Sequence, residues 1–199
     1  MTRSRRDLLR AAGLAGAGGL TGAAGCLDFA AGDGPQGPDG TPTELSCADD
    51  SFVRLDHPFE GFVAERKTEN PDTTLELSTE GTSETYGSDL RLVLRNTGDA
   101  AAETRGDEAY ALQRETDAGW QDVRGSPDGE AVELGGEPAT FEPNATHSWD
   151  LTLTEEGLAD DIDAADLTVC PDLGPGTHRF VYWGVEDADP VGIEFELVG

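Results

Sequence analysis

The sequence has almost no lysine, and this shortage goes with an extreme charge. Lys67 is the only lysine, the other basic residues are 12 arginines, and 41 acidic residues give the 199-residue chain a net charge of −28. A polyanion of this kind repels the phosphates of DNA and RNA, so non-specific nucleic-acid binding is excluded. The length allows one domain of ordinary size with short appendages.

The acidic residues are spread along the whole chain rather than gathered in one tail. At low salt such a charge destabilises the compact state through self-repulsion. In molar salt the Debye length falls to about 3 Å, and this repulsion is screened. Even carboxylate coverage with a single lysine therefore predicts a domain adapted to a very salty medium. An acidic patch for a basic partner or for cations is the alternative interpretation.

Long apolar runs and catalytic motifs are also missing. After the first 25 residues the chain contains no apolar stretch of about 18 residues, which excludes a polytopic membrane protein. It has no G-x-S-x-G nucleophile elbow, no Walker loop and no G-x-G-x-x-G after a strand. Carboxylates are so numerous that no acidic pair stands out. The sequence therefore predicts a protein that is not an enzyme and needs no cofactor.

The N-terminus resembles an export leader. Residues 4–9 read S-R-R-D-L-L, which is similar to the twin-arginine signal, with Arg5 and Arg6 as its arginine pair. Residues 23–26 read A-A-G-C and resemble a lipobox ending at Cys26, although alanine stands where leucine is usual. Removal of residues 1–25 leaves nine basic and 40 acidic residues, a net charge of −31. The alternative, an N-terminal helix of a cytosolic protein, is disfavoured by the many glycines.

The next segment, residues 26–47, has the composition of a flexible tether. Seven of the 20 positions from 27 to 46 are glycine or proline, which prevents the burial of a continuous apolar face. The leader, the lipidatable Cys26 and the tether together predict a domain over residues 48–199. We expect this domain to be held at the outer face of the cytoplasmic membrane, with membrane lipid as its partner through Cys26.

The three cysteines fit this location. If Cys26 carries lipid, Cys47 and Cys170 remain as an even pair in a compartment that permits disulfides. Their bond would close a loop of 122 intervening residues, which the chain-entropy model values at roughly 4–5 kcal/mol. Two unpaired thiols are the alternative interpretation.

The body of the chain predicts an all-β, antiparallel fold. In residues 90–95 leucine alternates with other residues, so Leu90, Leu92 and Leu94 share one face of a strand. Similar short segments recur between turns, and the run at 178–183 is apolar on both faces, as in a central strand. The expected strands are 51–55, 74–77, 90–95, 109–114, 120–123, 148–154, 178–183 and 192–198. One short helix is expected after Thr154.

Four motifs in this body resemble a bacterial Ig-like domain family over residues 85–199. They are Y-x-L-Q-R at 110–114, G-W-x-x-V at 119–123, W-x-L-x-L at 149–153 and L-G-P-G-T-H-R-F at 173–180. The resemblance implies an Ig-like β-sandwich of exported or membrane-associated proteins, without catalytic residues. Together with the leader, it is the pattern of a twin-arginine-exported lipoprotein of haloarchaeal type. Trp120 and Trp149 are the expected large core residues.

Several single residues remain as candidate sites. The histidines, His57, His147 and His178, are far apart in sequence, and we expect each to be an ordinary strand or loop residue rather than a metal ligand. A copper site of the cupredoxin type is disfavoured, because Cys170 precedes His178 by eight residues and the only methionine is Met1. The acidic loop 160–166 lacks the glycine and terminal glutamate of an EF-hand.

Asn144 begins an N-A-T sequon, a candidate glycosylation site in an exported chain. The sequence as a whole predicts a membrane-anchored, extracytoplasmic Ig-like module that binds an envelope protein or glycan or supports the envelope. The alternative is a solute- or cation-binding lipoprotein that serves a transporter, for which a pocket lined by His178, Trp183 and carboxylates would speak.

Overall fold

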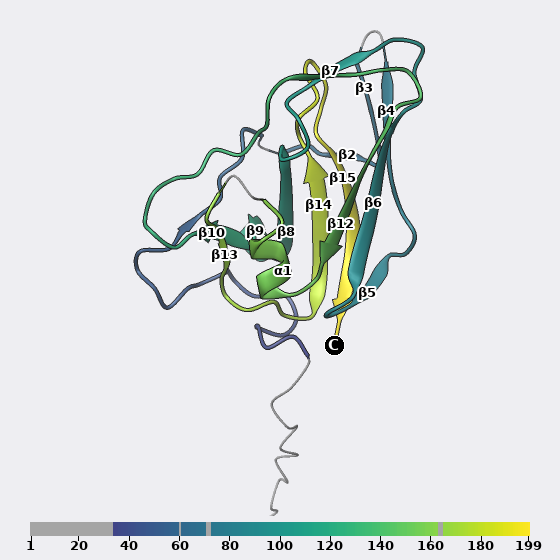
Figure 1. Cartoon of the computed structure of the whole chain (residues 1–199). Helices are drawn as coiled ribbons and strands as arrows, with labels where there is room; N and C mark the ends of the chain where they lie inside the picture. The colour runs from purple at the N-terminus through teal and green to yellow at the C-terminus, as the bar shows by residue number, and fades with distance from the viewer. Residues whose placement is uncertain (1–33, 60, 71–72, 163–164) are drawn as a thin grey trace, which may run out of the picture. The chain divides into compact units, whose positions relative to one another are not determined.

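A computed structural model describes residues 34–59, 61–70, 73–162 and 165–199. Within them the chain forms fifteen strands and one short helix, and most of the strands pair antiparallel (Figure 1). The strands are β1 (Val53–Arg54), β2 (Ala64–Glu65), β3 (Lys67–Glu69), β4 (Thr74–Thr79), β5 (Ser83–Thr85), β6 (Asp89–Asn96), β7 (Ala102–Thr104), β8 (Tyr110–Thr116), β9 (Gly119–Asp122), β10 (Arg124–Ser126), β11 (Ala139–Phe141), β12 (Thr146–Thr152), β13 (Thr168–Val169), β14 (Gly176–Tyr182) and β15 (Val191–Val198). No helix in this part of the chain is long and apolar enough to cross a membrane.

The largest sheet has the order β2-β15-β14-β8-β9, with β5 also paired to β15. Strands β2 and β5 run parallel to β15, and the other pairs are antiparallel. Strand β14 lies between β8 and β15, and Phe180, Val181 and Tyr182 are all buried. The prediction of a central strand with two apolar faces is therefore confirmed.

The second sheet has the order β12-β6-β4-β3 and is antiparallel throughout. In β6 the three leucines are buried, with Leu92 at 0% exposure, while Arg91 and Arg95 are exposed. The alternation read from the sequence is confirmed here. It arises because successive side chains of a strand point to opposite faces of the sheet.

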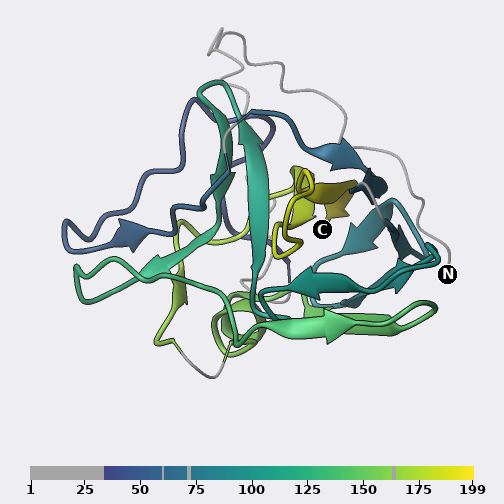
Figure 2. The same cartoon turned by 90° about the horizontal axis from the view of Figure 1, so that it is seen from above.

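The inward residues of both sheets belong to one hydrophobic core. Trp149 of β12 joins them, since its ring centroid lies 5.0 Å from that of Phe180 and 5.3 Å from that of Tyr182 in β14. Figure 2, seen from above, shows the yellow C-terminal strands with teal and green strands around them. The expectation that Trp120 would also fill the core is wrong. Trp120 is only half-buried, and the Arg179 guanidinium lies 4.3 Å from its ring centroid on the surface of β9.

The sequence predicted eight strands, about half the number found. The seven additional strands are each two or three residues long. Four of them complete the small sheets β1-β10-β13 and β7-β11, and β2, β3 and β5 pair with strands of the two larger sheets. An alternating pattern needs about four residues to be recognised. Strands of two or three residues form because a neighbouring strand pairs with them, so the sequence shows no alternating pattern at these positions.

The helix α1 (Glu155–Ala159) confirms the expected helical turn. The Thr154 hydroxyl accepts a hydrogen bond from the Gly157 N–H at 3.0 Å, so Thr154 is the N-cap. Leu158 of this helix, at 1% exposure, and Ile162 just after it, at 3%, belong to the hydrophobic core.

The predicted disulfide between Cys47 and Cys170 is present, with Cα atoms 5.6 Å apart.

The described part of the glycine- and proline-rich segment differs from a free tether, because residues 37–45 are hydrogen-bonded to the domain. The buried Arg114 guanidinium donates to the carbonyls of Pro38, Gly40 and Pro175. Two of these carbonyls, those of Pro38 and Gly40, belong to the glycine- and proline-rich segment, so Arg114 holds that segment against the domain.

Strand β14 begins at a glycine whose backbone conformation few other residues adopt. Gly176 has a φ of +134°, a backbone conformation that favours glycine, and the carbonyl of Gly40 lies 3.2 Å from where its Cβ would stand. A larger residue would strain the backbone and press on the segment held by Arg114.

Candidate functional site

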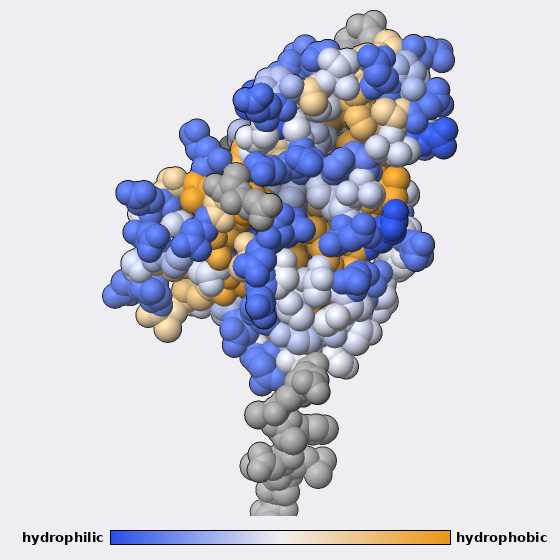
Figure 3. Space-filling model, in the orientation of Figure 1, coloured by the Kyte–Doolittle hydropathy of each residue, from blue (hydrophilic) through white to orange (hydrophobic). Residues whose placement is uncertain are grey.

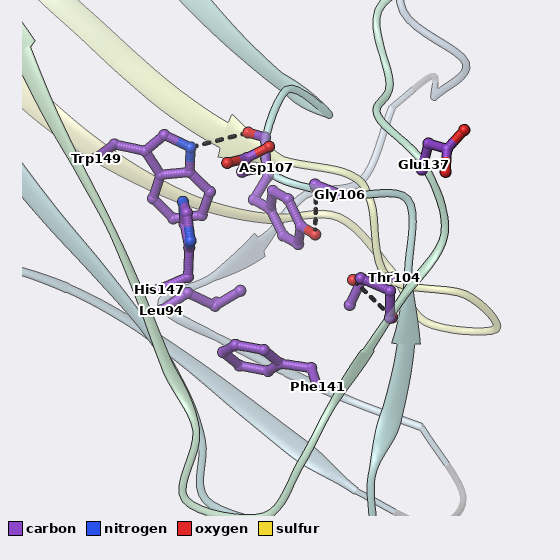
Figure 4. A pocket seen from close by; sticks show the side chains of 10 residues that line it. Leu94, Thr104, Gly106, Asp107, Glu137, Phe141, His147 and Trp149 are labelled. Atoms are coloured by element: carbon purple, nitrogen blue, oxygen red, sulfur yellow. Dashed lines mark hydrogen bonds between the residues drawn. The ribbon is translucent and has the colours of Figure 1, made fainter.

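A hollow of about 380 Å³ opens where the ends of β6, β12 and β14 meet the small sheet of β7 and β11. Four aromatic rings line it, from Phe141, His147, Trp149 and Tyr182. Figure 4 shows His147, Leu94 and Trp149 on one side of the space and Phe141 and Thr104 on others. Its size lies in the range of small-molecule sites, which are mostly apolar with a few polar groups.

Trp149 and Tyr182 are held by the loop that joins β7 to β8. The Trp149 indole donates to the carbonyl of Asp107 at 2.9 Å, and the Tyr182 hydroxyl donates to the carbonyl of Gly106 at 2.8 Å. Burial raises the pKa of Tyr182 to about 12, so its hydroxyl stays neutral at physiological pH. Both rings are therefore fixed at their polar ends, which leaves ring carbon to line the hollow.

His147 and Phe141 are the more accessible rings, since both are only half-buried. His147 meets Trp149 edge-on, with ring centroids 4.4 Å apart and planes at 71°. Both belong to β12 two residues apart, so alternation places them on the same face. This spacing was the one sequence signal that could have pointed to the hollow.

Phe141 is positioned by Asn96, the last residue of β6. The Asn96 amide donates to the carbonyls of Ala100, at 2.8 Å, and Phe141, at 2.9 Å. Its oxygen accepts from the hydroxyl of Thr73 at 2.6 Å. Asn96 is completely buried, so it anchors β11 to the second sheet through contacts that cannot be inferred from local pattern.

The charged groups of the hollow are carboxylates. Asp107 and Glu137 are exposed side chains at its border, while no arginine or lysine lines it. The Thr104 hydroxyl is already used, because it donates to the carbonyl of Ala139 at 3.1 Å.

A second hollow of about 300 Å³ adjoins the first and shares Asp107, His147 and Trp149 with it. Its additional carboxylates are Glu108, Asp150 and Asp161, and Tyr110 donates a hydrogen bond to Asp161. No basic side chain lines it either. The two hollows together form a continuous aromatic and acidic surface along Trp149 and His147.

His57 and Asp122 form a buried pair that has the appearance of catalytic machinery. The His57 Nε2 lies 2.8 Å from the Asp122 carboxylate, which also accepts from the Arg124 side chain and the Leu112 N–H. Burial raises the pKa of Asp122, but Arg124 and His57 outweigh it and lower the pKa to about 2. The other ring nitrogen of His57 has no hydrogen-bond partner, so the pair does not continue to a nucleophile among the described residues. The pair joins the end of β9 to the segment after β1, and the bonds from Leu112 and Arg124 connect Asp122 to β8 and β10.

The three histidines lie in three different places. His57 lies beside Asp122, His147 lines the hollow, and His178 is buried against Phe195. No group of three or more metal-ligating side chains occurs in the described parts of the chain. Cys170 is used in the disulfide and is thereby unavailable as a copper ligand.

The pocket that would have joined His178 and Trp183 is not formed. His178 is 1% exposed, and its Nδ1 bonds to the carbonyl of Gly176 at 2.9 Å. Trp183 instead lines a hollow of about 310 Å³ with His57, Arg105 and Glu133. His178 is thus packed inside the domain against Phe195, whereas Trp183 lines a different hollow.

Of the remaining candidate residues, Asn144 is exposed in the turn between β11 and β12, with a φ of +65°. An exposed turn is the setting that glycosylation requires. The acidic loop 160–166 is described only in part, and within it Asp161 is engaged by Tyr110. Arg5, Arg6 and Cys26 lie outside the described residues.

No protein-family model and no curated protein matches this sequence. Among solved structures, the beta-glucosidase of Listeria innocua in complex with isofagomine is similar at 20% identity and a TM-score of 0.33, over 64% of this chain and 16% of that enzyme. A beta-glucosidase of Erythrobacter marinus is similar at 17% identity and a TM-score of 0.30, over 63% of this chain and 16% of the enzyme. The similarity is distant and covers a small segment of each enzyme, so it assigns no family.

Proposed function

We propose that this chain is an exported, membrane-anchored binding module with an Ig-like sandwich fold and no catalytic activity. The observation that carries the proposal is the aromatic hollow between β12, β14 and the β7–β11 sheet. It combines fixed rings with few polar groups, which is the composition of a site for a small ligand.

The placement of the hollow supports this function. The N-terminal segment is held by Arg114 beside Gly176, at the first residue of β14, whereas Tyr182 lines the hollow at the last residue of that strand. Six residue steps of a strand span roughly 20 Å. The described N-terminal segment is therefore held at one end of β14, and the hollow opens at the other end of that strand.

The hollow also favours the second candidate, a solute-binding lipoprotein that serves a transporter. A concave site of about 380 Å³ suits a small solute better than the flat surface of a protein partner. An envelope protein or glycan is the partner expected if the module has a supporting role.

Binding is tested by filling the hollow. Ala139 lines it, while the neighbouring Thr140 does not, and both are exposed on β11. The probes are choline, glucose and benzoate, titrated by calorimetry into the full chain, Ala139→Phe and Thr140→Phe. We expect one probe to bind the wild type and Thr140→Phe equally and Ala139→Phe at least about tenfold more weakly. Binding that survives in Ala139→Phe would place the ligand elsewhere, and the absence of binding by all three probes would count against the module.

Export and anchoring are tested separately by cell fractionation. Arg5→Lys together with Arg6→Lys should leave the precursor in the cytosol, because the twin-arginine pair is the recognised feature. Cys26→Ser should remove lipid and release the domain from the membrane. Equal membrane recovery of the wild type and Cys26→Ser would contradict the anchor.

A further inference from the structure

We infer that the aromatic hollow is a site for a small organic cation, such as an alkylammonium group. The inference rests on the proposed binding function and names its ligand class. Three properties of the hollow lead to it: the state of its hydrogen-bond donors, its charge and its rings.

The side-chain donors of the hollow are nearly all in use. Thr104, Trp149 and Tyr182 each donate to a main-chain carbonyl, at 3.1, 2.9 and 2.8 Å respectively. His147 is the remaining potential side-chain donor in the lining. Anions need donors, and the acceptor oxygens of a sugar need them as well. A ligand that needs only acceptors and apolar contact is therefore the best match.

The charge of the lining separates this site from the other hollows of the described chain. Two of those hollows contain Arg105, and a third contains Arg66 and Arg179. The aromatic hollow and its neighbour contain carboxylates and no basic residue. The cations beside the two linings are engaged elsewhere. Arg91 lies 3.5 Å from Asp150, and the Arg124 guanidinium lies over the Tyr110 ring, 4.5 Å from its centroid. Arg105, between the lining residues Thr104 and Gly106 in the chain, lines two other hollows. We therefore expect a negative potential at the aromatic hollow.

The rings complete the site. A cation over an aromatic face within about 6 Å of the ring centroid is attracted by the negative face of the ring, and groups of aromatic rings are the usual site for quaternary ammonium ligands. Trp149 and Tyr182 form buried walls, and Phe141 and His147 form accessible ones. Asp107 and Glu137 then lie at the border, where they oppose the positive charge without enclosing it.

The decisive experiment compares choline with 3,3-dimethyl-1-butanol, which has the same shape but carbon in place of the charged nitrogen. Both are titrated calorimetrically into the full chain in high-salt buffer. We expect choline to bind on the order of tenfold more tightly than the neutral analogue, since the difference reports charge alone. Equal binding of the two would overturn the inference.

Two matched variants assign the effect to this hollow. Glu137→Gln should weaken choline binding about threefold and leave the neutral analogue unchanged, because it removes a charge from the border. Glu115→Gln, an exposed residue of β8 outside the hollow, should change neither. Equal effects of the two variants would contradict a local site.

Glucose and benzoate separate this inference from the proposed function. If either one binds and choline does not, the ligand class is wrong while the binding module stands. If none of the probes binds, both proposals fail.

Discussion

At the scale of single residues, Asp122 carries the strongest electrostatic constraint in the domain. Its carboxylate is fully buried, and it accepts from His57, from Arg124 and from two backbone N–H groups, those of Leu112 and Arg124. Arg124 is equally buried, so each charge depends on the other. A buried ion pair adds little net stability, but the loss of one partner leaves an uncompensated charge.

We therefore expect Asp122→Asn to lower the free energy of unfolding by about 3–5 kcal/mol. Urea unfolding in high-salt buffer measures the change. Asp150→Asn is the control, since that side chain is 55% exposed and its ion pair with Arg91 is on the surface; its effect should stay within about 0.5 kcal/mol. Similar losses in the two variants would show that Asp122 is not specially constrained.

His178 makes the second residue-scale prediction, which concerns pH. Burial lowers its pKa to about 4, an effect that Arg114 assists and the hydrogen bond to Gly176 partly opposes. Below the ordinary histidine pKa of about 6.5 the unfolded chain binds a proton that the folded chain does not. Stability should therefore fall as the pH drops from about 6.5 to about 4, by up to roughly 3 kcal/mol from this group.

The variant His178→Gln isolates that contribution, because glutamine can still donate to the Gly176 carbonyl but does not titrate. We expect its unfolding free energy to change less than that of the wild type across this pH window. Other groups affect both proteins alike, so the difference between the two slopes is the measurement. Parallel slopes would contradict the assignment.

At the scale of elements, the disulfide connects the N-terminal segment to the end of β13. It joins residues 123 positions apart, and the surrounding contacts are extensive: Arg54 donates to the carbonyl of Leu45 at 2.9 Å, and Gly37 donates to that of Leu173 at 2.7 Å. The disulfide and these hydrogen bonds thus hold the N-terminal segment against the domain.

The double variant Cys47→Ser, Cys170→Ser should lower the unfolding free energy by as much as about 4–5 kcal/mol, because the unfolded chain gains loop entropy. Reduction of the wild type should produce the same loss. The free energy of unfolding of the double variant should not change when reductant is added, so this variant is the control for the reduction experiment. A reductant effect that persists in the variant would mean that the loss has another cause.

At the scale of the whole molecule, the net charge of −28 dominates, and hydrophilic residues, blue in Figure 3, cover much of the face that it shows. Few ion pairs offset this charge in the described chain, and the exposed ones, such as Lys67–Glu69, contribute little. We therefore expect the folded domain to depend on screening by salt.

We expect the melting temperature to rise steeply between about 0.1 M and about 3 M salt, and the domain to unfold when salt is dialysed away. Thermal melts followed by circular dichroism measure this. Sucrose, which strengthens burial without screening charge, distinguishes screening from general exclusion. A melt that does not respond to salt would contradict halophilic adaptation.

The sequence by itself determined the β class, the long strands, the helical turn after Thr154 and the cysteine pair. Leu90, Leu92 and Leu94 illustrate why: the burial of a strand follows from its own alternation, so no distant partner is needed to recognise it. The Cys47–Cys170 pairing followed from counting alone, once Cys26 had been set aside.

Only the tertiary structure decided the short strands, the position of Trp120 and the aromatic hollow. Phe141, His147 and Tyr182 come from three strands and meet because Asn96 and the β7–β8 loop hold their surroundings. The binding of the Pro38 and Gly40 carbonyls by Arg114 is equally non-local. In each case the deciding contact joins residues far apart in the chain, and local pattern carries no information about which distant segments become neighbours.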